Sequence, residues 1–186
     1  MQPDLTAAID FATNAHRGQF RDGDCPLPYI THPLDVLANV RYVGEVTDPA
    51  VLCAAVLHDV VEESPVEPDE IEVQFGPDVR QLVQELTRQE PNSEQIQGMT
   101  KEEIWELRSS MLLEEIGQMS RRAQTVKLGD RLSNLREARR TKESSKLHRY
   151  NRQTAKILEI IPKEANPGLW NAVRELQQEI ASSQVN

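Results

Sequence analysis

The sequence predicts an all-α protein. Aromatic residues make up only 4% of the 186 residues, whereas Leu, Ala, Glu, Gln and Arg are abundant, and both features favour helix over sheet. Apolar residues recur at helical spacing, and no segment alternates apolar and polar residues for long enough to propose a strand. A chain of this length is most simply one compact helical bundle, residues 1–186, with a motif-bearing core at about 5–140 and C-terminal helices at about 146–182.

Prolines, glycines and capping residues divide the N-terminal half. A helix is expected over 4–17, closed by Gly18, and the Gly- and Pro-containing segment 19–31 is expected to be a loop. Pro33 fits the first position of a second helix that runs to about Tyr42.

Asp48 followed by Pro49 predicts the start of a third helix, which Ser64-Pro65 ends. Thr100 and Glu103 form a plausible capping box for a long helix after the polar segment 88–98. The remaining helices are predicted at 67–75, from Pro77 to about Leu86, 123–136, 146–161 and 169–181.

Charge is unevenly distributed along the chain. The net charge of −9 argues against non-specific binding to nucleic acid or to an anionic membrane. Residues 121–156 nevertheless hold 12 Lys and Arg against 3 acidic residues, which is +9, so the remainder carries −18. This division suits a small polyanionic ligand that bridges a metal ion in the acidic N-terminal half and arginines in the basic C-terminal half. A solvated basic helix face would explain most of these basic residues when each is taken singly.

Neither a membrane span nor a signal sequence is recognisable. The two cysteines, Cys25 and Cys53, fit neither a disulfide framework nor a zinc ribbon. We therefore expect a reduced cytoplasmic protein without membrane or nucleic-acid partners, and the sequence leaves room for a homo-oligomer.

The segment 54–64, AAVLHDVVEES, combines an apolar run with four ionisable side chains in six positions. If it is helical, Asp59, Glu62 and Glu63 lie within one turn of one another. A solvated helix end would explain Glu62 and Glu63, but it does not explain why His58 and Asp59 interrupt an apolar run. An imidazole beside carboxylates favours a metal site.

Further candidate ligands lie elsewhere. His32 precedes Pro33 at the mouth of a helix, and Asp130 is flanked by apolar residues, where a charge is costly unless it is paired or bound to a metal. Together with His58 and Asp59 they would form an octahedral nitrogen and oxygen site, which suits Mn²⁺ or Fe²⁺ better than structural Zn²⁺.

The order H…HD…D resembles that of the HD-type metal phosphohydrolases. A narrower resemblance is to the hydrolase domain of the RelA/SpoT family and to the small stand-alone alarmone hydrolases of the Mesh1 type. The motifs that carry it are AHRGQFR at 15–21, PYITHPL at 28–34, LHDVVEES at 57–64, FGPDVRQLV at 75–83 and KLGDRLSNLR at 127–136.

This resemblance implies Mn²⁺-dependent removal of the 3′-pyrophosphate from the nucleotide (p)ppGpp. It implies that the metal ligands are His32, His58, Asp59 and Asp130. It implies that Glu62 and Glu63 handle the attacking water, that Arg21 and Asn134 contact the nucleotide, that Lys127 has a phosphate or structural role, and that His16 lies outside the metal shell.

Four departures from the family pattern concern the nucleotide rather than the metal. Glu63 stands where Asp is usual, Asp22 replaces a lysine, Ser133 replaces His or Tyr, and the loop between Arg21 and Tyr29 is two residues longer. They leave two alternatives open, a metal-dependent phosphatase acting on another nucleotide such as NADPH, and a non-catalytic alarmone sensor.

Overall fold

The computed structural model describes residues 3–21, 26–141 and 143–183. The α-helices of these residues are α1 Leu5–Ala15, α2 Thr31–Ala38, α3 Pro49–Leu57, α4 Val60–Glu63, α5 Pro68–Phe75, α6 Pro77–Leu86, α7 Lys101–Gln118, α8 Arg121–Thr141, α9 Ser144–Ile160 and α10 Pro167–Ser183. A π-helical turn, η1 Asn39–Val43, and a 3₁₀ turn, η2 Lys163–Ala165, complete the set. The only β-type pairing among the described residues is one isolated bridge between Phe20 and Pro28, so the all-α prediction is confirmed.

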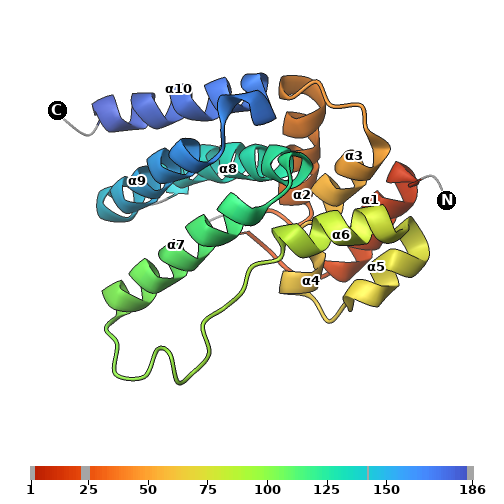
Figure 1. Cartoon of the computed structure of the whole chain (residues 1–186), viewed down its shortest axis with the longest axis horizontal. Coiled ribbons are helices and arrows are strands. Elements are labelled where there is room, and N and C mark those ends of the chain that lie inside the picture. Colours follow the sequence, from red (N-terminus) through yellow and green to blue (C-terminus); the bar gives the residue numbers. More distant parts are fainter. Residues whose placement is uncertain (1–2, 22–25, 142, 184–186) are drawn as a thin grey trace.

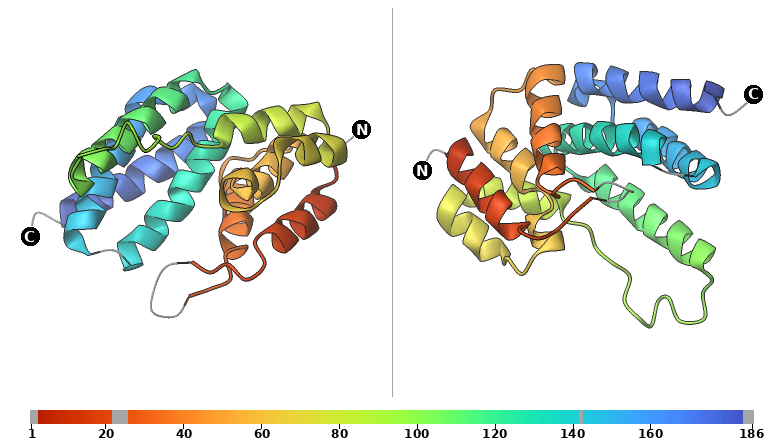
Figure 2. Two further views of the ribbon diagram at one scale, coloured as in Figure 1. Left: turned by 90° about the horizontal axis from the view of Figure 1, so that it is seen from below. Right: turned by 180° about the vertical axis from the view of Figure 1, so that it is seen from behind.

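The long helix α8 lies between two groups of helices (Figure 1). It packs against α2, α3 and α6 on one side and against α9 and α10 on the other. The views from below and from behind show the same division, with α7 and the segment leading into it extending away from the first group (Figure 2). Side chains on different faces of α8 can therefore reach both groups.

Helix α3 is the most deeply buried element. Every residue from Ala50 to Leu57 is buried, which matches a sequence that is apolar on all sides. Its burial brings the following residues, His58 and Asp59, into the interior of the molecule.

The predicted caps are present at two helix starts. The Asp48 side chain accepts a hydrogen bond from the Ala50 amide at 2.9 Å, and Pro49 occupies the first turn, where its missing amide hydrogen costs nothing. Thr100 and Glu103 form the expected reciprocal capping box at the start of α7.

Two predicted helix boundaries are wrong. Helix α2 begins at Thr31, before Pro33, because a proline within the first turn still removes only an amide that has no partner inside the helix. After Ala38 the predicted helix changes to the wider π-turn η1.

The third predicted helix is not continuous. It ends at Leu57, and α4 starts at Val60. The ring of His58 approaches the Ala55 carbonyl oxygen at 2.9 Å, and Asp59 adopts φ −100° and ψ −5°, so the two residues form a turn between α3 and α4.

Helix α8 is longer than the predicted 123–136 and runs from Arg121 to Thr141.

No helix among the described residues has the length and apolar character needed to span a membrane.

Candidate metal centre and substrate cleft

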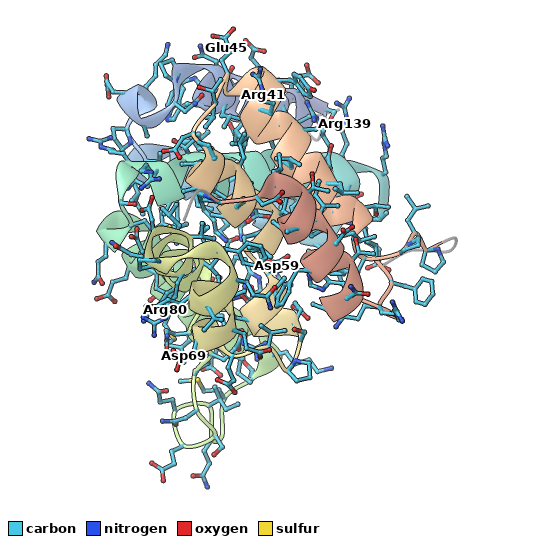
Figure 3. All side chains as sticks on the ribbon, turned by 90° about the vertical axis from the view of Figure 1, so that its right-hand side faces the viewer. Arg41, Glu45, Asp59, Asp69, Arg80 and Arg139 are labelled. Carbon is cyan, nitrogen blue, oxygen red and sulfur yellow. The ribbon has the colours of Figure 1, made fainter. Side chains whose placement is uncertain are left out.

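Four predicted ligands meet where α2, α8 and the turn between α3 and α4 approach one another. The Nε2 atom of His32 lies 3.4 Å from an oxygen of Asp59 and 3.4 Å from Oδ1 of Asp130. The Nε2 atom of His58 lies 3.1 Å from Asp59 Oδ1 and 4.0 Å from Asp130 Oδ1. Ligand atoms of His32, His58 and Asp59 all lie within 4.8 Å of one another, and Figure 3 shows Asp59 near the middle of the molecule.

The two imidazoles present their Nε2 atoms to this cluster. The Nδ1 atom of His58 lies 2.9 Å from the Ala55 carbonyl oxygen, which can only accept, so Nδ1 donates there and Nε2 faces the cluster. Within the described part of the chain this buried Nε2 has no hydrogen-bond partner. The Nδ1 atom of His32 is held at 3.2 Å from the Ser133 hydroxyl. Two imidazole nitrogens and two carboxylates fit a divalent cation.

Both carboxylates are held by neighbouring polar groups. The Tyr29 hydroxyl donates to Asp59 Oδ2 at 2.7 Å. The Lys127 ammonium lies 3.0 Å from Asp130 Oδ2, and the Asn134 amide donates to Asp130 Oδ1. Although burial opposes ionisation, Lys127 and the two histidines hold the pKa of Asp130 well below its ordinary value. Asp130 is therefore an anionic, oriented ligand candidate.

The same balance acts on His32. Burial lowers its pKa, but hydrogen bonds that the His32 ring donates to Asp130 and Asp59, together with the charges of these carboxylates, outweigh burial and raise the pKa to about 9. The two carboxylates therefore favour a positive charge at the position that the His32 ring faces.

A cleft of about 330 Å³ opens beside the cluster. Among the predicted site residues it is lined by Arg21, His32, Asp59, Glu62, Glu63, Lys127, Asp130 and Asn134. His58 is buried beneath its surface, with 2% of the residue exposed. The structure therefore brings all nine predicted site residues to one place.

Glu62 and Glu63 enter this cleft from α4, the short helix after the turn. Glu62 accepts from the Arg88 backbone amide at 3.3 Å and lies 3.4 Å from the Arg88 guanidinium. Burial raises the pKa of Glu62, and Arg88 partly offsets that effect. Glu62 is the more enclosed carboxylate, while Glu63 is exposed.

Arg21 does not stand alone in the cleft. Its guanidinium makes a two-pronged ion pair with Glu137 of α8, in which Nε donates to Oε1 at 2.5 Å. Its Nη2 atom also approaches the Asn134 side-chain oxygen at 3.5 Å. This ion pair ties the N-terminal loop to α8 beside the cleft.

Sequence reasoning missed several lining residues, namely Phe20, Tyr29, Arg88, Glu137 and Tyr150. Tyr29 and Phe20 stand within the quoted motifs, but their contacts depend on the folded loop. Arg88, Glu137 and Tyr150 come from segments that looked solvated, and only the tertiary structure brings them to the cleft.

The sequence singled out three other residues. Asp22 and Cys25 lie outside the described residues. His16 makes a 2.8 Å contact from Nδ1 to Gln19, and burial lowers its pKa. It lies outside the group of His32, His58 and Asp59 whose ligand atoms are within 4.8 Å of one another; Asp130 also lies outside that group, but its Oδ1 is 3.4 Å from His32 Nε2 and 4.0 Å from His58 Nε2.

Comparison with known proteins adds the family. A family model described as "HD domain" matches residues 8–161. The chain is 39% identical over 136 residues to a Xenopus tropicalis protein named guanosine-3′,5′-bis(diphosphate) 3′-pyrophosphohydrolase MESH1, covering 73% of this chain and 70% of that protein. It is 38% identical over 146 residues to the Homo sapiens protein of the same name, covering 78% and 75%.

A solved structure is also similar to this chain. Described as a metazoan ortholog of SpoT that hydrolyzes ppGpp, it superimposes with a TM-score of 0.81 at 28% identity and covers 96% of this chain and 97% of its own. The order of the ligand candidates, their convergence and these matches agree, and the chain belongs to the HD domain family.

Proposed function

We propose that this chain is a metal-dependent phosphohydrolase that acts on guanosine 3′,5′-bis(diphosphate), either ppGpp or pppGpp, and releases the 3′-pyrophosphate. The observation that carries this proposal is the convergence of two imidazoles and two carboxylates at the base of a cleft. Relatives at 38–39% identity are named for this reaction.

His32, His58, Asp59 and Asp130 would hold the cation. Mixed imidazole and carboxylate donors suit Mn²⁺, and Fe²⁺ or another divalent cation fits the same donors. A cation bound there would lower the pKa of a water molecule and polarise a phosphoryl oxygen of the substrate.

The chain's own groups account for the remaining chemistry. Glu62 and Glu63 would orient the attacking water, and the raised pKa of Glu62 favours its accepting and returning a proton. Arg88 holds Glu62 in place, and Lys127 fixes Asp130. Asn134 and Arg21 also line the cleft, where the nucleotide would contact them.

Turnover with a panel of nucleotides tests this function. Purified protein with Mn²⁺ is incubated separately with ppGpp, pppGpp and NADPH, and pyrophosphate and phosphate are measured. We expect pyrophosphate from the first two. If phosphate is released from NADPH and neither ppGpp nor pppGpp is cleaved, NADPH replaces ppGpp as the proposed substrate. Binding of ppGpp without turnover under any divalent metal would favour a sensor.

Asp59→Asn and Asp69→Asn form a matched pair for this assay. The Asp69 side chain is 87% exposed and lies far from the cluster (Figure 3), so only the Asp59 variant should lose activity.

A further inference from the structure

His16 is a buried histidine that the proposed reaction does not yet use. It is the C-cap residue of α1, and only 3% of it is exposed. Burial lowers its pKa below the ordinary value of 6.5, so the ring is neutral near neutral pH. A neutral imidazole inside a protein needs hydrogen-bond partners, and these partners indicate what the side chain does.

Gln19 connects His16 to the end of α4. The Nε2 atom of Gln19 donates to the backbone carbonyl oxygen of Glu63, which can only accept. This contact fixes the orientation of the Gln19 amide, so Oε1 is the atom that lies 2.8 Å from Nδ1 of His16. Because Oε1 can only accept, Nδ1 is the donor. The hydrogen bonds therefore run from His16 to Gln19 and from Gln19 to Glu63, and Figure 2 shows the end of α1 close to α4.

The end of α4 depends on such side chains. This helix has only four residues, and Ser64 after it is extended, with φ −144° and ψ 171°, so its last carbonyl groups have no partner within the helix. The Ser64 hydroxyl donates to the Val60 carbonyl oxygen at 2.6 Å. Gln19 is the corresponding donor for Glu63. Gln19 therefore fixes the backbone of Glu63 relative to the loop after α1.

The two carboxylates of α4 are held differently. The Glu62 side chain lies 3.4 Å from the Arg88 guanidinium. The Glu63 carboxylate has no such partner among the residues that the structure describes. Its side chain is also one methylene longer than the Asp of the RelA/SpoT pattern, and each added rotatable bond gives a side chain more freedom. The position of the Glu63 backbone therefore determines where its carboxylate can reach.

We propose that His16 is a positioning residue for the hydrolysis. By donating to Gln19, it keeps the Gln19 amide on the Glu63 carbonyl oxygen, and this contact holds the Glu63 carboxylate toward the attacking water. Neither His16 nor Gln19 lines the cleft, so both act through Glu63 rather than by touching the substrate. This inference rests on the proposed function.

Replacing His16 by Asn and by Leu separates its hydrogen bond from its packing. The amide nitrogen of Asn is attached to Cγ, as Nδ1 of His is, so His16→Asn can still donate to Gln19. His16→Leu is of similar size and has no donor. We expect His16→Leu to lower kcat for ppGpp about tenfold with KM unchanged, as the loss of one hydrogen bond from the transition state would. His16→Asn should retain most of the wild-type kcat.

Gln19→Leu removes the second contact and should cause the same loss of kcat. The double variant, His16→Leu with Gln19→Leu, should be no worse than either single variant, because residues that act through one another are not additive. Asn14→Ala is the matched control. Asn14 accepts from Arg17 at 2.7 Å, over the same spacing of three residues and at the same end of α1, and this hydrogen bond does not lead to α4.

A route through Tyr29 is the rival explanation. The His16 ring lies 4.8 Å from the Tyr29 ring, centroid to centroid, and the Tyr29 hydroxyl donates to Asp59 at 2.7 Å. That route would weaken metal binding, so Mn²⁺ titration distinguishes the two, and we expect Gln19→Leu to keep the wild-type Mn²⁺ affinity. Weaker Mn²⁺ binding in proportion to the loss of kcat, or equal losses in His16→Asn and His16→Leu, would overturn the proposal.

Urea denaturation of every variant separates positioning from support of the fold. Gln19 is only partly buried, so Gln19→Leu tests the proposal even if His16→Leu does not fold. A lower free energy of unfolding with an unchanged kcat in Gln19→Leu, or additive losses in the double variant, would overturn the inference. Wild-type protein that releases no pyrophosphate from ppGpp would instead overturn the proposed function.

Discussion

The turn between α3 and α4 and the helix α8 supply ligand candidates in opposite ways. His58 and Asp59 occupy a break between two helices, where Asp59 has φ −100° and ψ −5°. Asp130 lies inside a continuous helix of 21 residues. The turn positions its side chains through local backbone geometry, whereas α8 positions Asp130 through packing against its neighbours.

The charges around the two carboxylates differ as well. Asp130 has a buried ammonium partner, Lys127, at 3.0 Å. Asp59 accepts instead from the neutral Tyr29 hydroxyl and faces His32 and His58. The comparison teaches that one carboxylate serves both the fold and the site, and the other serves mainly the site.

Replacing each carboxylate separately should give the largest effects. Both Asp130→Asn and Asp59→Asn should abolish metal-dependent turnover. Asp130→Asn should also lower the free energy of unfolding by about 3–5 kcal/mol, because it leaves the buried Lys127 ammonium unpaired.

Urea denaturation measured without metal separates the two variants. Asp59→Asn should lower the free energy of unfolding by less than Asp130→Asn does, because Asp59 has no ammonium partner and the imidazoles that it faces can lose their charge. Equal destabilisation by both variants would break the distinction between the turn and α8.

Tyr29→Phe tests the support of the turn. It removes the hydroxyl that donates to Asp59 at 2.7 Å, and loss of a group that orients a metal ligand typically costs about 10–100-fold in metal affinity or activity. Mn²⁺ titration and turnover check this expectation. Tyr42→Phe is the control, since Tyr42 is 77% exposed on η1. An unchanged Mn²⁺ affinity in Tyr29→Phe would show that the backbone turn alone orients Asp59.

Gly129→Ala tests the packing of α8. An added Cβ would lie 2.7 Å from Val40 Cγ2 and 3.5 Å from the Val36 carbonyl oxygen. This crowding should cost about 1–3 kcal/mol of stability and weaken metal binding by displacing Asp130 from His32 on α2.

Gly117→Ala in α7 is the matched control, because the nearest atom to its added Cβ is Ile160 Cγ2 at 3.7 Å. That variant should gain about 0.5–1 kcal/mol from helix propensity. Val40→Ala should relieve part of the loss in the Gly129 variant. Stabilisation by Gly129→Ala would contradict the close approach of α8 to η1.

The smallest expected effect concerns Arg88. It lowers the pKa of Glu62, which burial raises above the ordinary value of 4.5. Arg88→Ala should therefore raise this pKa further and move the acidic limb of the pH–rate profile to higher pH. Arg108→Ala is the control, since Arg108 pairs with Glu90 at 2.7 Å and does not line the cleft. A limb that moves to lower pH, or by the same amount in both variants, would exclude Glu62 as the titrating group.

Much of this architecture was readable in the sequence, where local chemistry determined it. Two helix starts could be predicted because capping acts over three or four residues. The signals were Asp48 with Pro49 and Thr100 with Glu103. His58, Asp59 and Asp130 stood out because ionisable groups among apolar neighbours need partners.

The unpredicted features depend on tertiary contacts. Helical periodicity alone predicted one continuous helix through His58 and Asp59. The structure shows instead that these residues form a turn between α3 and α4. Arg88 and Glu137 looked like solvated charges because their partners, Glu62 and Arg21, are 26 and 116 residues away. The change from α2 to the π-turn η1 likewise had no sequence signal that we recognised.

The pairing of each cation in the cleft with a carboxylate determines how that cleft can discriminate among anions. Lys127, Arg88 and Arg21 are each already paired with a carboxylate of the protein. An incoming phosphate must therefore displace that carboxylate before it can pair with the cation. Exchange gives little net energy unless the new contacts match in geometry. A polyanion of the wrong shape, such as a nucleic-acid strand, therefore gains little from this cleft, even though it contains three cationic side chains.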